Sequence, residues 1–273
     1  MQLLSDWEQF RHSFHRIKRN NSGYSTNLYA GKEQVESWLA HGQLFCLSGH
    51  GADLFLRRDR DFHHVFHVAA SSAALTSALK GAPLPPTALT VDLVGTPDAL
   101  APWIGAYRMA GYAAHTTLCR MSKSGPASVA PVPEEGVEQA GPEDAAAIVA
   151  FFERLLDRHA EQLPSIDEVA YEARQGRVLL VRRGNAPCGV LIFALKGKSA
   201  QLRYWHVDEQ ARGQGTGSRL MRQFLAHCRG AARIVLWVKA NNTASLSIYR
   251  YYGFETDTLV DEIMIKTPIE NHE

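Results

Sequence analysis

The chain has 273 residues, enough for two ordinary domains, and its 45% hydrophobic and 21% charged residues are typical of a globular protein. Its net charge of +1 argues against bulk nucleic-acid binding, which requires a strongly basic face. The first residues lack the basic start and long apolar core typical of a secretion signal, and no apolar run approaches the roughly 20 residues of a membrane-spanning helix, so we expect neither. The four scattered cysteines show no CxxC spacing, so we expect reduced thiols in a cytoplasmic protein with no membrane partner.

The first half opens with an amphipathic helix that we expect to dock on its own domain. Its apolar side consists of Leu4, Trp7, Phe10, Phe14 and Ile17. The polar stretch 19–32 follows, and we expect it to form a mobile loop that could lie over a cleft. Further on, "FHHVFH" places His63 and His67 on one face of a strand. A closed zinc site needs four ligands and no Cys, Asp or Glu partner is evident, so no metal site is expected.

The segment 125–135 is rich in Ser, Pro and Gly and has no periodicity, which predicts a linker between two domains, 1–124 and 136–273. Ser165 and Glu168 form a capping box, which predicts that a helix begins at this point of the chain. The other elements predicted in the second half are a strand at 136–140, a helix at 141–161, strands at 177–183, 189–196 and 200–207, a helix after the glycines at 213–217, a strand at 233–238, a helix at 241–253 and a strand at 258–266.

The first half repeats this pattern more faintly. The stretches 33–51, 62–68 and 107–112 resemble segments that lie 134, 139 and 142 residues further on. The second pair shares aromatic-His-Val, and the third shares Tyr-Arg-x-x-Gly-aromatic. The offsets grow along the chain, as loop insertions would produce, so we predict a tandem duplication of one α/β unit. Chance similarity between two α/β segments is the alternative.

A glycine-rich loop precedes the helix that follows the strand 200–207. It lacks the lysine of a P-loop, and Ser218 stands where a dinucleotide fingerprint has its third glycine. The pattern that does fit is R-x-x-G-x-G, formed by Arg212, Gly215 and Gly217. Unpaired amides at a helix N-terminus attract phosphate, so the loop predicts a pyrophosphate site. The alternative is a tight turn without a ligand.

A second motif follows the loop, N-x-x-A-x4-Y-x3-G-F, formed by Asn241, Ala244, Tyr249, Gly253 and Phe254. Together the two motifs resemble the GNAT acetyltransferase superfamily over about residues 136–266. The resemblance implies an α/β fold with two tandem GNAT-like domains, each a mixed, mostly antiparallel sheet flanked by helices. The first copy would be degenerate, because "AASSAALTSALKG" has neither the alternating glycines nor the arginine.

The resemblance also implies acetyl-CoA as co-substrate and a set of site residues. Backbone groups near Val207 would pair with the pantetheine arm and stabilise the oxyanion, and Tyr249 would protonate the leaving thiolate as general acid. The alternative for Tyr249 is simple packing on the sheet. The implied cofactor-binding residues are Val207, Arg212, Gly213, Gln214, Gly215, Thr216, Gly217, Ser218 and Asn241.

A general base is harder to find in the sequence. Family members often place Glu or His on the fourth strand, at positions that here hold Gln201 and Arg203. Tyr204 and His206 should point to the opposite face unless a β-bulge intervenes. The amine could instead lose its proton to water or to a carboxylate of the early helices, or the acceptor could have a lower pKa and need no base. The carboxylates are Glu153, Asp157, Glu161 and Glu172.

The sequence therefore predicts an N-acetyltransferase that moves an acetyl group from acetyl-CoA to a primary amine of a small-molecule or peptide acceptor. The acceptor could be an amino acid, a polyamine, an antibiotic or a protein N-terminus, and the oligomeric state stays open. One alternative is a non-catalytic acyl-CoA-binding regulatory or sensor protein. Another is a dinucleotide-binding oxidoreductase.

Overall fold

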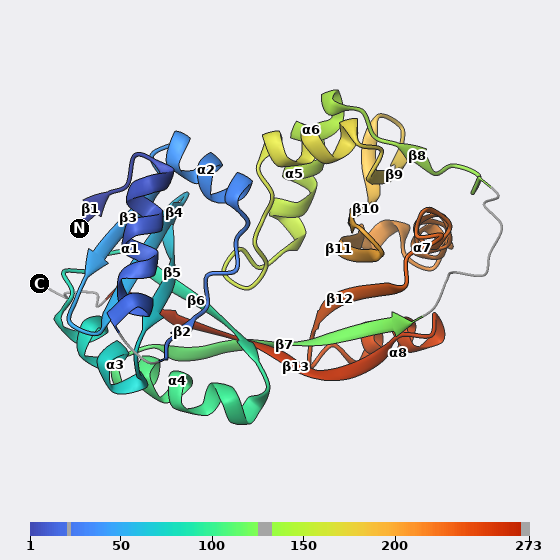
Figure 1. The fold of residues 1–273 in the computed structure, drawn as a ribbon. Helices are drawn as coiled ribbons and strands as arrows, with labels where there is room; N and C mark the ends of the chain where they lie inside the picture. The colour runs from blue at the N-terminus through green and yellow to red at the C-terminus, as the bar shows by residue number, and fades with distance from the viewer. Residues whose placement is uncertain (21–22, 125–132, 269–273) are drawn as a thin grey trace, which may run out of the picture. The chain divides into compact units, whose positions relative to one another are not determined.

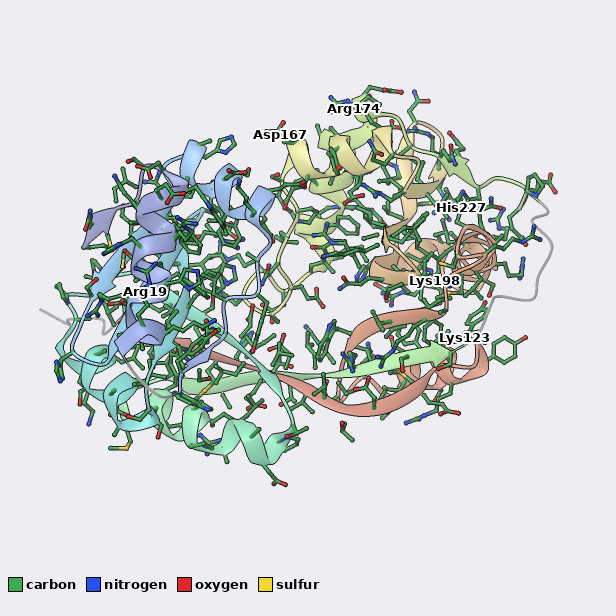
Figure 2. The ribbon with its side chains drawn as sticks, viewed as in Figure 1. Arg19, Lys123, Asp167, Arg174, Lys198 and His227 are labelled. Carbon is green, nitrogen blue, oxygen red and sulfur yellow. The ribbon has the colours of Figure 1, made fainter. Side chains whose placement is uncertain are left out.

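The computed structural model describes residues 1–20, 23–124 and 133–268 (Figures 1 and 2). The chain divides into two compact units: unit 1 consists of Met1–Leu118 and Thr258–Glu273, and unit 2 consists of Cys119–Asp257. The chain therefore passes from one unit to the other twice. Most of the linker predicted at 125–135 lies outside the described residues, and the domain boundaries based on it stay a prediction.

Unit 1 contains a sheet with the strand order β1-β3-β4-β5-β6-β13. Neighbours run antiparallel except β5 and β6, which run parallel. The elements up to the second unit are β1 (Gln2–Leu3), α1 (Trp7–Asn20), β2 (Ser25–Thr26), α2 (Lys32–Ala40), β3 (Leu44–Ser48), β4 (Ala52–Asp59), β5 (Phe62–Ala69), α3 (Ser72–Gly81), β6 (Ala88–Gly95), α4 (Pro97–Met109) and β7 (Ala113–Ser124).

Unit 2 contains a sheet with the strand order β7-β12-β11-β10-β9-β8. The strands from β8 to β11 are antiparallel neighbours, whereas β11 and β12 run parallel. The elements are β8 (Glu138–Gln139), η1 (Pro142–Asp144), α5 (Ala145–Leu155), α6 (Ile166–Arg174), β9 (Val178–Arg183), β10 (Ala186–Lys196), β11 (Ser199–Val207), η2 (Glu209–Ala211), α7 (Thr216–His227), β12 (Arg233–Lys239), α8 (Thr243–Tyr251) and β13 (Glu255–Lys266).

Apart from β2 and two short 3-10 turns, the two halves of the chain present their elements in the same order: one strand, two helices, three strands, a helix, a strand, a helix and a strand. This is the order that a tandem duplication predicts. Helices cover the sheet of each unit, and separate apolar cores lie on the two faces of each sheet. The predicted fold class, an α/β chain with mixed, mostly antiparallel sheets flanked by helices, is confirmed.

The predicted helix at 141–161 is shorter than its apolar spacing suggested. Helix α5 ends at Leu155 because Leu156 has extended backbone, with φ −101° and ψ 147°. The residues after it form a turn in which the amides of Ala160 and Glu161 donate to the Asp157 carbonyl, at 3.0 and 2.8 Å. The capping box is confirmed, since Ser165 and Glu168 exchange hydrogen bonds of 2.8 and 3.1 Å at the start of α6.

Each unit receives the end of a strand that starts in the other. Residues 260–266 of β13 pair with β6, and Met264 is buried in the core of unit 1. The second part of β7 adjoins β12, and Met121 is buried in the core of unit 2. The strand ends are held in similar ways: Lys266 donates to the Ala110 carbonyl at 3.0 Å, and Lys123, labelled in Figure 2, lies against Gly253.

Strand β2 lies where the sequence predicted a mobile loop, and for its described residues that expectation is wrong. Ser25 and Thr26 pair with Ala69 and Val68 of β5. Because β4 pairs with the other edge of β5 along its full length, β2 must lie on the edge that faces β6. The parallel pairing of β5 and β6 covers only 62–64 and 88–90, so β2 enters where these strands part.

The side chain of Asn27 bridges the two separating strands. Its Nδ2 donates to the carbonyls of Val65 on β5 and Asp92 on β6, at 3.1 and 3.0 Å. Its Oδ1 accepts the amide of His67 at 2.7 Å, and only 7% of the residue is exposed. This segment of the chain therefore fills the opening between β5 and β6 with satisfied hydrogen bonds.

The buried histidines of β5 have ordinary partners. His63 contacts the Thr87 hydroxyl at 2.9 Å, His64 contacts Thr90 at 3.1 Å, and His67 contacts Tyr107 at 3.0 Å. Burial lowers the pKa of His67 to about 3, so its ring is neutral at pH 7. In the described part of the chain, no group of three or more His, Cys, Asp or Glu residues is arranged to hold a metal ion, and no helix has the length and apolar character to span a membrane.

Candidate functional site

The site begins where the parallel strands β11 and β12 separate. Their pairing covers residues 199–202 and 233–236, and beyond Leu202 the strand β11 pairs, within the described part of the chain, with β10 and no longer with β12. Val207, at the end of β11, still pairs with Gly189 of β10. The backbone edge of β11 that faces β12 is thus open from Arg203 onward. Unit 2 has the kind of opening that an extended ligand can enter by strand-like pairing.

A β-bulge at Arg203 changes the direction of the side chains along β11. Tyr204 pairs with Ile192 and Leu202 with Phe193, so the register skips Arg203. Leu202 consequently lies in the core beneath α7, whereas Tyr204 lies in the core beneath α5 and α6. The sequence anticipated that a bulge would change these faces, but nothing in it marked the position.

His206 follows the bulge and shares the α5 face with Tyr204. Its ring lies 5.9 Å from that of Phe152, and burial, reinforced by the charges of Arg212 and Lys239, lowers its pKa to about 4. The imidazole is therefore neutral at pH 7. It is also a much weaker base than an ordinary histidine.

The glycine loop has the geometry of an open helix N-terminus. Gly213 and Gly215 have left-handed backbone, with φ of 73° and 74°, and Gly215 is the N-cap residue of α7. The N-cap glycine has no side chain with which to cap the helix, so the first amides of α7 are suited to accept another partner. Gly217 serves a different purpose, since a Cβ there would lie 3.3 Å from Trp205 and 3.5 Å from Val207.

The other predicted residues of the loop differ in what they can offer a ligand. Arg212 is exposed, whereas Thr216 is 3% exposed, so the Thr216 hydroxyl is not available at the surface. The Gln214 side chain donates to the Gln210 carbonyl at 2.9 Å, which holds the loop together. Ser218 is half-buried in the first turn of α7.

Gly189 on β10 is a site residue that the sequence analysis missed. A Cβ at this position would lie 2.7 Å from the Thr216 side chain and 3.1 Å from that of Leu220. The glycine thus allows the N-terminus of α7 to approach the sheet closely. The available signal was an isolated glycine beside an apolar strand run, which often marks a close approach of two backbones.

The other two predicted residues lie at helix α8, Asn241 just before its N-cap and Tyr249 within it. Asn242 caps this helix by accepting the Ser245 amide at 3.1 Å, so Asn241 is not used as the cap and its side chain is exposed. Tyr249 is 8% exposed, and its ring lies 5.5 Å from that of Trp205 at the end of β11. Burial, with a smaller effect of the charge on Glu161, raises the pKa of Tyr249, so the phenol stays protonated at neutral pH.

The candidate carboxylates fall into distinct environments. Glu153 is exposed on α5. Glu172 is buried on α6 and forms ion pairs with Arg177 at 2.5 Å and Arg203 at 3.7 Å. Asp157 and Glu161 lie in the turn after α5, each just under 4 Å from the ammonium of one lysine at the end of β12.

Comparison with known proteins assigns this part of the chain to a family. Residues 147–254 match the family model described as the acetyltransferase (GNAT) family. This segment is a GNAT domain. GNAT enzymes generally use acetyl-CoA as acyl donor, so membership supports acyl-CoA-dependent acetyl transfer in general terms. No curated protein matches the chain in sequence.

Solved structures of GNAT proteins are similar to most of the chain. A GCN5-related N-acetyltransferase from Sphaerobacter thermophilus is 16% identical with a TM-score of 0.57, over 87% of this chain and 86% of its own. A GNAT-family acetyltransferase from Colwellia psychrerythraea is 12% identical with a TM-score of 0.54, over 98% of each chain. At such identities the likeness shows the fold, and it extends to both halves of the chain.

Proposed function

We propose that unit 2 is an acetyl-CoA-dependent N-acetyltransferase that acts on a primary amine of a small-molecule or peptide acceptor. The observation that carries the proposal is the N-terminus of α7, a 12-residue helix whose N-cap residue is the left-handed Gly215 and has no capping side chain. Aligned peptide dipoles and unpaired amides make such a terminus a favourable place for a pyrophosphate. The adjacent opening between β11 and β12 supports the same ligand, because its free backbone edge suits the amide-containing pantetheine arm.

The cofactor would be held mainly by backbone groups. The amides from Gly213 to Ser218 would receive the pyrophosphate, and the exposed Arg212 would add a charge-assisted hydrogen bond. The backbone near Val207 would pair with the pantetheine arm on the edge of β11 that β12 leaves free. Asn241, which is exposed and not used in capping α8, would contact the same arm.

The chemistry would be direct attack of the amine on the thioester. A carbon–nitrogen bond forms as the carbonyl becomes a tetrahedral oxyanion, which a backbone amide near Val207 would stabilise. The intermediate collapses by breaking the carbon–sulfur bond, and the sulfur leaves as a thiolate. Tyr249 would donate a proton to that sulfur, since burial keeps the phenol protonated.

Unit 1 would bind no cofactor. Its helix α3 has a capped N-terminus, because the Ser71 hydroxyl accepts the Ala74 amide at 3.1 Å. Strand β2 and Asn27 occupy the opening between β5 and β6. These features support a degenerate first copy and a stoichiometry of one acetyl-CoA per chain.

The rival function is a non-catalytic acyl-CoA-binding sensor. It is favoured by Gln201 and Arg203, which occupy the strand positions where many family members carry a base. It is disfavoured by Tyr249, whose protonated phenol lies beside Trp205 at the end of β11. The two functions share the cofactor and differ in whether an amine is consumed.

Calorimetry with acetyl-CoA and an acceptor screen test the proposal together. We expect one binding event per chain, and free-thiol release that depends on an amine drawn from amino acids, a polyamine, an aminoglycoside and a peptide with a free N-terminus. Binding without thiol release for any of these amines would favour the sensor. Absence of binding would contradict both functions.

A further inference from the structure

The acceptor amine must lose a proton before it can attack. An alkylamine with a pKa near 10 is only about one part in a thousand neutral at pH 7, so a nearby base would increase the reactive fraction. Neither Gln201 nor Arg203 can supply it, and His206 has a pKa of about 4. A base for this reaction must come from outside β11.

Glu161 has the surroundings that such a base requires. Its Oε1 lies 3.8 Å from the ammonium of Lys239, at the end of β12 where β11 and β12 have already separated. Its other oxygen, Oε2, is buried and has no hydrogen-bond partner among the described residues. A buried carboxylate oxygen without a donor is costly to maintain, so this oxygen is suited to receive one from a ligand.

The location of Glu161 agrees with the reaction site. Its negative charge contributes to the raised pKa of Tyr249, the proposed acid, and to that of Tyr204 on β11. It is therefore within electrostatic reach of the phenol that would protonate the leaving sulfur. Acetyl transfer to an amine that is protonated at pH 7 needs a base that deprotonates the amine and an acid that protonates the leaving sulfur, both near the thioester.

We infer that Glu161 is the general base that deprotonates the acceptor amine, with Lys239 as a positioning residue that keeps its carboxylate ionised. The inference rests on the acetyl transfer proposed above. The proton moves from the ammonium to Oε2 of Glu161, and the nitrogen lone pair then forms the bond to the acyl carbon. The nitrogen loses its next proton to water, the thiolate takes one from Tyr249, and solvent restores both side chains.

The other carboxylates are engaged elsewhere. Glu172 is held by Arg177 and Arg203, and Glu153 is exposed on α5. Asp157 lies 3.9 Å from the same lysine, but its second oxygen accepts the His159 amide at 3.1 Å. Among these four carboxylates, Glu161 is the one with a buried oxygen that has neither a hydrogen-bond partner nor an ion-pair partner among the described residues.

The expected pH dependence follows from the groups that surround Glu161. Burial raises its pKa, the charge of Asp157 raises it further, and Lys239 opposes both; Tyr249 and Tyr204 are neutral near pH 7. A base must be ionised, so kcat/KM should fall as the pH falls through this raised pKa. The fall should begin at a higher pH than for an exposed glutamate, whose pKa is about 4.3.

The test compares pH profiles of kcat/KM, measured with acetyl-CoA and the best amine of the acceptor screen. Glu161→Gln should lower kcat/KM at pH 7 by about 100-fold and remove the acidic fall. Lys239→Met should move that fall to higher pH, which a purely structural role would not do. Glu255→Gln, at an exposed glutamate of the same unit, should match the unaltered protein.

A second measurement does not depend on turnover. Calorimetry should show the same acetyl-CoA affinity in Glu161→Gln as in the unaltered protein, because the base would act on the amine and not on the cofactor. An unchanged pH profile in Glu161→Gln, or a rise in KM alone, would overturn the inference and leave acetyl transfer intact. Failure to acetylate any amine while acetyl-CoA binds would instead overturn the proposed function itself.

Discussion

The parallel strand pairs β5/β6 in unit 1 and β11/β12 in unit 2 both separate after a few residues. Among the described residues, another strand pairs in the first opening and none pairs in the second. In unit 1, Val68 pairs with Thr26 of β2. Its counterpart in the repeat, Val207, pairs with Gly189 of β10 and with no second strand among the residues that the structure describes. Strand β2 is also the one strand that has no equivalent in the order of unit 2.

The same contrast extends to the helix that follows and to the repeated tyrosine. Helix α3 is capped by Ser71, whereas α7 begins at Gly215 without a side-chain cap. Tyr107 is fully buried and contacts His67, whereas its counterpart Tyr249 lies beside the opening of unit 2. The proposed cofactor site would thus depend on a free strand edge and an uncapped helix, and in unit 1 Thr26 and Ser71 occupy the matching positions.

The largest effect is expected from Gly215→Glu. A side chain is strained at φ 74°, and the new charge would repel a pyrophosphate, so acetyl-CoA affinity should fall by at least ~100-fold. Calorimetry measures the affinity, and the shift in melting temperature that acetyl-CoA causes should vanish. Gly197→Glu is the control, because Gly197 has φ 57° in the turn between β10 and β11. An unchanged affinity in Gly215→Glu would contradict the pyrophosphate assignment.

Tyr249→Phe should reduce kcat by about 10-fold to 100-fold and leave acetyl-CoA affinity nearly unchanged. The substitution removes only the proton donor to the leaving sulfur, and a thiolate is a good leaving group, so the loss is at the low end for an acid catalyst. Steady-state kinetics and calorimetry separate the two quantities. Tyr251→Phe alters an exposed tyrosine of the same helix and should have no effect. Equal turnover in both variants would remove the acid role.

Asn27→Ala should lower the free energy of unfolding by about 2–4 kcal/mol, because two carbonyls and one amide between β5 and β6 lose their partner. Denaturant unfolding measures the change. Acetyl-CoA affinity should stay the same, since the site would be in unit 2. Asn185→Ala, in an exposed turn, serves as control. A second acetyl-CoA bound by Asn27→Ala would show that unit 1 retains a site beneath β2.

The smallest pair of effects comes from adding one methyl group in each unit. Gly189→Ala should destabilise the protein by about 1–3 kcal/mol and weaken acetyl-CoA binding, because α7 would be pushed from the sheet. Gly105→Ala on α4 has open space around it and should stabilise by about 0.5–1 kcal/mol. Thermal unfolding of both variants, with calorimetry for the first, measures these effects. A neutral Gly189→Ala would mean that the approach of α7 is not tight.

The sequence predicted most of what is local in this structure. The strands of unit 2, the capping box at Ser165 and the loop around Gly215 depend on side-chain period and neighbouring residues, which a single sequence contains. Asn27 escaped prediction because its three partners lie 38 to 65 residues away. The bulge at Arg203 escaped because no Gly or Pro marks it.

The sequence also did not predict which sheet strand β13 joins. The alternating residues of 258–266 predict a strand but do not say which sheet it joins. Its pairing with β6 joins segments about 170 residues apart, for example Lys266 with Leu89. Glu161 is an intermediate case. The sequence included it among four carboxylates, and the structure distinguishes it by a buried Oε2 that has no hydrogen-bond partner among the described residues.

The place of β13 in unit 1 has a consequence for biosynthesis. Chains emerge from the ribosome from the N-terminus, and domains usually fold as soon as they are complete. Unit 1 cannot complete its sheet until residues 260–266 have been made, although β6 is translated long before. Until then β6 lacks its neighbour and has an unpaired edge, which is a surface prone to aggregation. The nascent first half should therefore depend on chaperones until the final strand arrives.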